Sequence, residues 1–219
     1  YNSQRDAALQ VVAEIEQAGA KAVALQLNVS DVASFGEFAQ QVKTQLHQVW
    51  GRESFDYLVN NAGVGLYASF AETSEALFDE LMNIHFKGPF FLTQQLLPLM
   101  ADGGRILNVS TGLARFALPG YAAYASMKGG KGVRTRYQAK ELGARGISGN
   151  SIAPGAIETD FGGGVVRDIS DLNQHIASET ALGRVGLPDD IGSVVAFLCS
   201  EDSKWINAQR IEVSGGYKI

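Results

Sequence analysis

The chain alternates between extended apolar segments and segments with helical periodicity, and this alternation restricts its fold more than any other feature. Extended patterns occur at residues 23–29, 55–59, 105–109, 147–153 and 210–213. Helical patterns occupy residues 4–18, 31–49, 73–100, 121–142 and 188–199. Strands that alternate with helices predict βαβ units. We therefore expect an α/β fold with a doubly wound parallel sheet.

Length and composition fit a single domain over residues 1–219. The chain has 219 residues, of which 46% are hydrophobic, and no internal repeat. Its net charge of −5 argues against a surface that follows nucleic-acid phosphates, because such a surface needs clustered positive charge. No apolar run reaches the roughly 18 residues of a membrane span, and no basic-then-apolar leader opens the chain. We expect a soluble cytoplasmic protein with neither a nucleic-acid nor a membrane partner.

The sequence predicts neither a metal site nor a disulfide. Cys199 is the only cysteine and lies on the apolar face of a helical pattern, where a packed thiol is far more common than a reactive one. His47, His85 and His175 have no carboxylate or cysteine at metal-ligand spacing.

Polar side chains follow three of the predicted strands. Thr111 follows residues 105–109, Asn60-Asn-Ala-Gly63 follows residues 55–59, and Pro154-Gly155 follows residues 147–153. The carboxyl ends of parallel strands meet at one edge of a sheet, where ligand sites form.

Tyr124 and Lys128 are four residues apart in Tyr-Ala-Ser-Met-Lys, so they share one face of a helix. A phenol beside a fixed cation ionises more readily than a free tyrosine, and it can act as an acid or a base.

These motifs, with Pro154-Gly155-x-x-x-Thr159 and Arg184-x-Gly-x-Pro188, resemble those of the short-chain dehydrogenase/reductase family in order and spacing. The chain is most similar to the 3-oxoacyl-carrier-protein reductase branch. The resemblance implies a Rossmann-type fold and an NAD(P)-dependent oxidoreductase that transfers a hydride between nicotinamide and a carbonyl or secondary alcohol. It also implies a homo-oligomer, either a tetramer or a dimer.

In the mechanism that the resemblance implies, Tyr124 is the general acid and base for the substrate oxygen. Lys128 lowers the pKa of the phenol and can bond the nicotinamide ribose. Thr111, where the family usually has Ser, can donate to the oxygen as it becomes negative. Ser110 is the alternative donor, but neighbouring side chains on a strand point to opposite faces, which favours Thr111.

His85 is a second departure, because the family usually has Asn at this position, three residues before Gly88. Imidazole can donate and accept, and its titration at about pH 6.5 could enter the pH profile. The alternative is a helix histidine that packs near the site without a proton role.

The resemblance implies cofactor contacts from several segments besides Tyr124 and Lys128. Those expected along the adenosine are Asn28, Val29, Asn60, Ala62 and Gly63, and those expected at the carboxamide are Pro154, Gly155, Ile157 and Thr159. For Asn28 and Thr159, ordinary turn chemistry is the alternative.

The family's first strand, glycine-rich turn, first helix and second strand have no counterpart in residues 1–219. Either the sequence is part of a longer chain or the protein lacks these elements. Residues 1–5 contain no acid that could bind a ribose 2′-hydroxyl, so NADP(H) is the preferred cofactor, with NAD(H) as the alternative.

Residues 155–180 form a long, glycine-rich connection, which predicts a mobile segment that covers the substrate. The segment contains Phe161, Arg167, Asp168 and His175, a mixture that suits an apolar acyl chain or a polar sugar. The substrate is therefore left open.

The predicted helix at residues 121–142 carries Gly129, Gly130 and Gly132, each of which costs about 1 kcal/mol relative to Ala in a helix interior. Lys131 and Arg134 stand where the family usually buries apolar groups against a neighbouring subunit. These residues put the tetramer in doubt.

Two other functions stay open. A catalytically silent homologue that acts as a binding or scaffold subunit would account for Thr111 and His85, but not for Tyr124 with Lys128. A sugar epimerase or dehydratase of the wider superfamily would account for Thr111, although the extended C-terminal substrate domain of such proteins is not found in this sequence.

Overall fold

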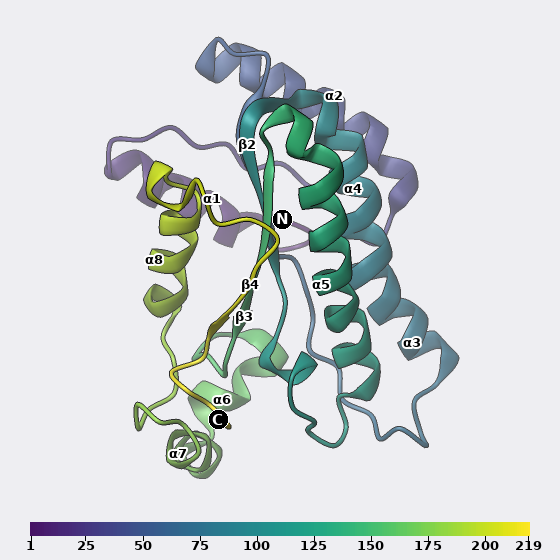
Figure 1. Cartoon of the computed structure of the whole chain (residues 1–219), viewed down its shortest axis with the longest axis vertical. Coiled ribbons are helices and arrows are strands. Elements are labelled where there is room, and N and C mark those ends of the chain that lie inside the picture. Colours follow the sequence, from purple (N-terminus) through teal and green to yellow (C-terminus); the bar gives the residue numbers. More distant parts are fainter.

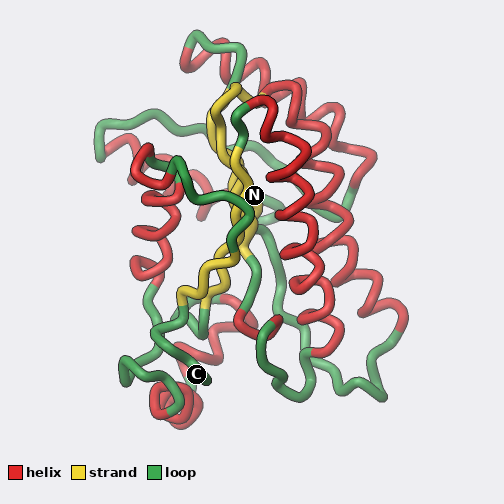
Figure 2. The backbone as a smooth tube through the Cα atoms, viewed as in Figure 1, coloured by secondary structure: helices red, strands yellow, loops and turns green.

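The computed structural model describes residues 1–219 and contains one parallel sheet with helices on both faces (Figure 1). The strands are β1 (Phe55–Asn60), β2 (Met100–Val109), β3 (Ser148–Pro154) and β4 (Arg210–Val213), and they lie side by side in chain order. Each neighbouring pair is parallel, so every connection must cross a face of the sheet. Figure 2 shows the strands as a central layer between helices. The prediction of a Rossmann-type doubly wound sheet is confirmed.

The helices carry the crossings. They are α1 (Arg5–Gln17), α2 (Phe35–Gln45), α3 (Glu75–Met82), α4 (Gly88–Leu96), α5 (Ala122–Leu142), α6 (Val165–Asp168), α7 (Ser170–Ser178) and α8 (Pro188–Leu198). α2, α4 and α5 lie on one face of the sheet and α8 lies on the other (Figure 1). Phe35 and Leu92 join α2 and α4 in one core cluster, whereas Leu198 of α8 packs against Leu107 and Ile152.

Residues 23–29, predicted as a fifth strand, do not join the sheet. Their backbone bonds another segment only at Tyr1, whose nitrogen donates to Leu25 O at 2.9 Å and whose oxygen accepts from Leu27 N at 2.8 Å. Two bonds to one residue do not make a ladder, because a strand needs a neighbour along its whole length.

The N-terminal helix follows its predicted range but lies outside the core. α1 ends beside Gly19, which has a φ of +86°, and none of its residues is buried. Leu9, Val11 and Ile15 remain exposed. Periodicity identified this helix correctly, but it does not say which surface a helix covers.

The buried face of α5 meets β2 through polar rather than apolar side chains. Asn108 of β2 is fully buried, and its Oδ1 accepts from Asn60 Nδ2 at 3.0 Å and from an Arg134 nitrogen at 2.8 Å. Its Nδ2 donates to Thr135 Oγ1 at 3.0 Å and to Gln138 Oε1 at 2.9 Å. One amide therefore ties β1, β2 and α5 together.

Lys131 and Arg134 were expected where the family meets a neighbouring subunit, and this expectation was wrong. Both side chains are buried against β2, where Lys131 Nζ donates to Val109 O at 3.2 Å. The nitrogens of both side chains are thus satisfied partly by backbone and amide oxygens inside the chain itself.

The glycines of α5 differ in what surrounds them. A Cβ at Gly130 would lie 2.7 Å from Phe86 Cε2, so the missing side chain lets the π-helical segment Asn83–Lys87 pack against α5. A Cβ at Gly132 would meet nothing within 4 Å. Packing explains Gly130, and nothing in the structure explains Gly132.

This difference can be tested with two alanine variants. Gly132→Ala should raise the free energy of unfolding by about 1 kcal/mol, because helix propensity improves and no contact is disturbed. Gly130→Ala should be clearly less stable than Gly132→Ala, because its methyl group displaces the Phe86 ring. Urea unfolding of both variants measures the difference, and equal stabilities would contradict this account of Gly130.

Candidate active site

Tyr124 and Thr111 meet at the carboxyl end of β2. Tyr124 lies in the first turn of α5 and is almost fully buried. The Thr111 hydroxyl lies close enough to the phenol to lower its pKa, and it also accepts from Leu113 N at 3.3 Å. Ser110 points elsewhere, since its Oγ donates to the backbone oxygen of Lys128 at 3.1 Å. The alternation of side chains along the strand therefore favours Thr111 over Ser110 as the hydroxyl that faces a reacting oxygen.

The electrostatics of Tyr124 differ from our expectation that Lys128 lowers the pKa of the phenol. Burial raises the pKa of Tyr124, and the hydrogen bond with Thr111 only partly offsets this effect. Lys128 Nζ is 5.5 Å from the centroid of the Tyr124 ring and donates instead to Val109 O at 3.0 Å. Tyr124 is therefore a protonated phenol at neutral pH.

Lys128 is itself buried, and burial lowers the pKa of its ammonium to about 8. A hydrogen bond with Lys131 acts in the opposite direction and keeps this pKa from falling further. The Lys128 side chain is therefore mainly charged at neutral pH and loses its charge in mildly alkaline solution.

His85 is fully buried in the π-helical segment Asn83–Lys87. Its Nε2 lies 2.8 Å from Val64 O, and its ring stands edge-on to Tyr124 with 5.1 Å between centroids. Burial first, and then the charges of Lys128 and Lys131, lower the pKa of His85 to about 3. The expected titration at about pH 6.5 is thus absent, and the imidazole is neutral, as the packed-histidine alternative requires.

Gly63 is in close contact with His85. A Cβ at Gly63 would lie 2.6 Å from His85 Cε1 and 3.7 Å from Lys128 Nζ. His85 Nδ1, near the same point, is buried without a hydrogen-bond partner. Gly63, which was expected beside the cofactor, therefore also leaves space for the imidazole of His85.

Several predicted cofactor side chains are already engaged within the fold. Asn60 Nδ2 donates to Thr93 Oγ1 and to Asn108 Oδ1, so its backbone and its side-chain oxygen remain for a ligand. Asn28 Oδ1 accepts from the backbone nitrogen and the hydroxyl of Ser30, which is the turn chemistry set beside its predicted adenine contact.

Of the other residues predicted along the adenosine, Val29 packs against the core cluster of α2 and α4, whereas Ala62 is exposed beyond β1. Val29 therefore offers its backbone rather than its side chain to a ligand.

The predicted carboxamide segment follows β3. Gly155 N donates to Val213 O at 3.1 Å, and a Cβ at Gly155 would press on Ser214. Thr159 Oγ1 accepts from Phe161 N at 3.2 Å, again as in a turn. Pro154, the last residue of β3, therefore leads into a backbone that is held against β4.

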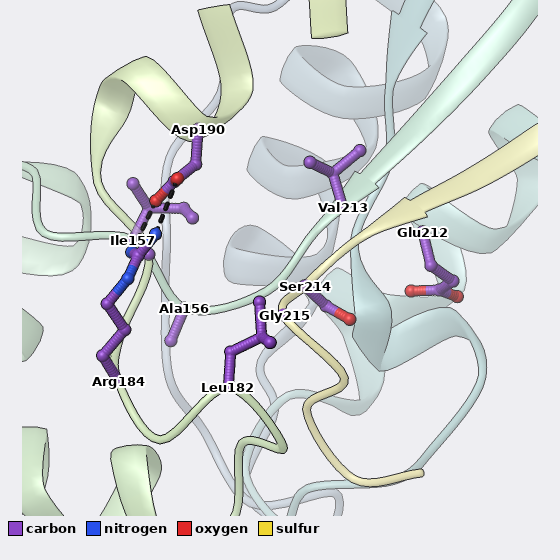
Figure 3. Close-up of a pocket in the computed structure, with 10 residues that line it drawn as sticks. Ala156, Ile157, Leu182, Arg184, Asp190, Glu212, Val213, Ser214 and Gly215 are labelled. Atoms are coloured by element: carbon purple, nitrogen blue, oxygen red, sulfur yellow. Dashed lines mark hydrogen bonds and ion pairs between the residues drawn. The ribbon is translucent and has the colours of Figure 1, made fainter. Parts of the chain in front are cut away.

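Ile157 and Ala156 line a cavity of about 240 Å³ beside this segment, together with residues from the ends of β4 and α8 (Figure 3). Arg184 at its edge donates two hydrogen bonds to the Asp190 carboxylate, which also accepts from Leu187 N at 2.7 Å. The Arg-x-Gly-x-Pro motif thus caps α8 and fixes the wall of this cavity.

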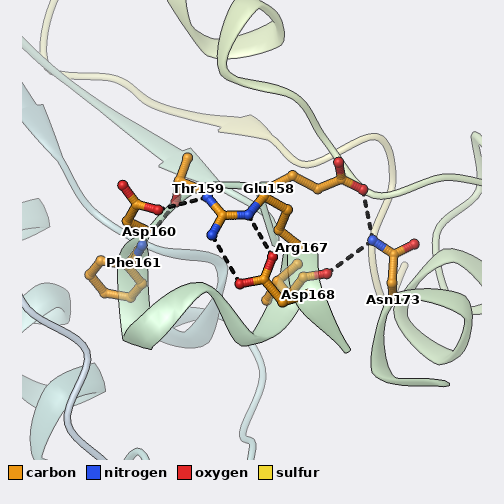
Figure 4. A network of polar contacts seen from close by, with 8 residues as sticks. Glu158, Thr159, Asp160, Phe161, Arg167, Asp168 and Asn173 are labelled. Atoms are coloured by element: carbon orange, nitrogen blue, oxygen red, sulfur yellow. Dashed lines mark hydrogen bonds and ion pairs between the residues drawn. The ribbon is translucent and has the colours of Figure 1, made fainter. Parts of the chain in front are cut away.

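Residues 155–180 are more ordered in secondary structure than expected, because they contain α6 and α7. Arg167 pairs with both Asp160 and Asp168, and Asn173 donates to Glu158 Oε1 at 2.7 Å (Figure 4). These contacts fold the segment back on itself.

The same segment places Phe161 over the phenol, with 6.1 Å between the ring centroids of Phe161 and Tyr124. Tyr121 lies 6.3 Å from Tyr124 and Tyr67 lies 5.5 Å from Tyr121, again between centroids. Neither Tyr67 nor Tyr121 was expected at the site, because neither belongs to a motif. The position of Tyr121, three residues before Tyr124, was the only available signal, and Tyr67 carries none.

None of the helices combines the length and the apolar composition that a membrane crossing needs. No three side chains of His, Cys, Asp or Glu gather as metal ligands would.

The two neighbouring hydroxyls can be separated by mutation. Thr111→Val keeps the shape and removes the donor, so kcat/KM for carbonyl reduction should fall by about 10²–10³-fold. Ser110→Ala should cost mainly stability, about 1 kcal/mol, because its buried hydroxyl bonds only backbone. Steady-state kinetics and melting temperatures of both variants, with Thr111→Ser as the active control, measure this. An inactive Ser110→Ala beside a normal Thr111→Val would reverse the assignment.

Comparison with known proteins agrees with this geometry. A family model described as Enoyl-(Acyl carrier protein) reductase matches residues 1–218. Tetrahydroxynaphthalene reductase PfmaG of Pestalotiopsis fici is 33% identical, with 99% of this chain and 80% of the relative covered.

Solved structures are similar over the whole chain. The angucycline C-6 ketoreductase LanV with bound NADP is 34% identical, with a TM-score of 0.93 and coverage of 100% of this chain and 84% of that one. A blue fluorescent protein from a metagenomic library, in complex with NADPH, is 32% identical, with a TM-score of 0.89 and coverage of 100% and 86%. The chain therefore belongs to the short-chain dehydrogenase/reductase family and is an oxidoreductase of that family.

Proposed function

We propose that the chain is an NADP(H)-dependent carbonyl reductase in which Tyr124 protonates the substrate oxygen. The observation that carries this proposal is the buried phenol of Tyr124 beside the buried Thr111 hydroxyl at the carboxyl end of β2. NADP(H) is supported by the absence of an acid in residues 1–5 and by the NADP and NADPH bound in the two solved relatives.

The donor set around Lys128 fits a nicotinamide cofactor. An ammonium has three N–H donors, and Lys128 uses one on Val109 O. Another can serve a ribose hydroxyl, while the backbone after Pro154 would hold the carboxamide. NADPH, when bound, supplies the hydride.

Side chains of the chain itself then bind and protonate the carbonyl oxygen of the substrate. Thr111 donates a hydrogen bond to the carbonyl oxygen as negative charge develops, and Tyr124 transfers its proton to that oxygen. The charge of Lys128 stabilises the phenolate that remains. Phe161, which lies over Tyr124, excludes water from the reacting atoms.

The protonation state of Tyr124 suits the donation of a proton. Because burial raises its pKa, the phenol keeps its proton at neutral pH and can give it to a carbonyl oxygen. The paired Tyr124 and Thr111 argue against a catalytically silent homologue. The curated relative named above is a reductase, which supports reduction over sugar epimerisation or dehydration.

A flat aromatic or polycyclic ketone is the substrate class that fits best. Tyr67, Tyr121 and Phe161 surround the approach to Tyr124 with aromatic rings, which suit a planar apolar substrate. The names of two relatives, a tetrahydroxynaphthalene reductase and an angucycline ketoreductase, point to the same class.

Removal of the proton donor tests the mechanism. Tyr124→Phe should lower kcat by about 10²–10⁴-fold while leaving NADPH binding largely intact, because only the hydroxyl is lost. The assay is NADPH oxidation with a panel of polycyclic ketones, 3-oxoacyl thioesters and oxidised sugars. Retention of more than about a tenth of the wild-type kcat would show that another group supplies the proton.

Cofactor preference tests the second part of the proposal. The dissociation constant for NADPH should be lower than that for NADH, because residues 1–5 offer no carboxylate to repel a 2′-phosphate. Fluorescence titration of the protein with each dinucleotide measures both constants. Tighter binding of NADH would overturn this interpretation.

A further inference from the structure

Two lysine nitrogens converge on one backbone oxygen beneath the site. Lys128 and Lys131 are three residues apart on α5 and therefore share one face. Lys128 Nζ lies 3.0 Å and Lys131 Nζ lies 3.2 Å from Val109 O. Both side chains are buried, and Lys131 is fully so.

No carboxylate balances these lysines. Neither takes part in any ion pair of the structure. The titratable groups around them are the cation Arg134 on α5, His85 on the π-helical segment and Tyr124. Two buried ammonium groups in contact cannot both stay charged at low cost.

The deeper lysine is the one that loses its proton. Burial, followed by the charges of Lys128 and Arg134, lowers the pKa of Lys131 well below its ordinary value. A neutral amine has two N–H donors and one lone pair. Lys131 can therefore donate to Val109 O and accept from the Lys128 ammonium at the same time.

We propose that Lys131 is a positioning residue for Lys128: its neutral amine accepts a hydrogen bond from the Lys128 ammonium and holds it at Val109, with the third N–H directed at the ligand site. The role of Lys128 in turnover rests on the proposed function, whereas the contact between the lysines does not. Lys131 lies one turn beyond the Tyr-x-x-x-Lys motif and touches no reacting atom.

A purely structural Lys131 would behave differently when replaced. Burying an amine costs desolvation free energy, so an apolar side chain of similar size should raise the melting temperature in either case. The titration of Lys128 is what distinguishes the two roles. If Lys131 only fills space, the charge on Lys128 is unaffected by this change. If Lys131 is an acceptor for Lys128, the proton on Lys128 becomes easier to lose.

Lys131→Met is the decisive variant, because it keeps the chain length and removes the nitrogen. The lysine Cε resonances, followed by ¹H–¹³C NMR without cofactor, report the titration of Lys128. We expect this titration to move to lower pH by about one unit, since a hydrogen bond to a charged group is lost while burial remains. The alkaline limb of kcat/KM should move in the same direction, and the melting temperature should rise.

Two controls accompany it. Lys131→Gln keeps an acceptor for Lys128 and a donor for Val109, so it should restore most of the wild-type titration. Lys140→Met removes an exposed lysine from the same helix and should change neither the titration nor the pH profile.

The outcomes separate the two proposals. An unchanged Lys128 titration in Lys131→Met overturns the positioning role, as does a lower melting temperature with activity lost equally at every pH. If the wild-type chain reduces no ketone with NADPH, the proposed function fails. The NMR titration still decides whether Lys131 holds Lys128, because it requires no turnover.

Discussion

The geometry of the site depends on the buried amide of Asn108. It accepts from Asn60 and Arg134 and donates to Thr135 and Gln138, which uses the capacity of both amide atoms. These bonds fix α5 relative to β2 in a way that apolar contacts, which tolerate sliding, do not. Because β2 leads into Thr111 and α5 carries Tyr124, the separation of phenol and hydroxyl follows from hydrogen bonds made deeper in the fold.

Periodicity predicted most of the fold but missed α6 and α7, and its failure at residues 23–29 has a physical cause. The four strands of the sheet and the helices α1, α2, α4, α5 and α8 lie where apolar patterns placed them. Residues 23–29 carry an equally good extended pattern, but outside their own turn their backbone bonds only Tyr1. A strand is a property of a pair of segments, so a pattern within one segment does not establish it.

The sequence predicted which candidate side chains lie near one another, but not their electrostatics. Motif spacing brought Tyr124, Lys128 and Thr111 together, and strand alternation distinguished Thr111 from Ser110. The pKa directions of Tyr124 and His85 depend on burial, which arises only when distant segments close over them. Tyr67 and Phe161 reach the site from loops, where no repeat marks a residue for function.

The ion pairs of Arg167 in residues 155–180 are exposed, whereas Tyr124 below them is buried. Dissolved salt therefore affects the two differently. Arg167 and its partners Asp160 and Asp168 are all solvent-accessible, so dissolved salt screens their attraction. The buried side chains of Tyr124 and Thr111 are shielded from the same ions. Ionic strength therefore acts on the pairing within residues 155–180, while the polar groups beneath Phe161 lie in surroundings that salt does not reach.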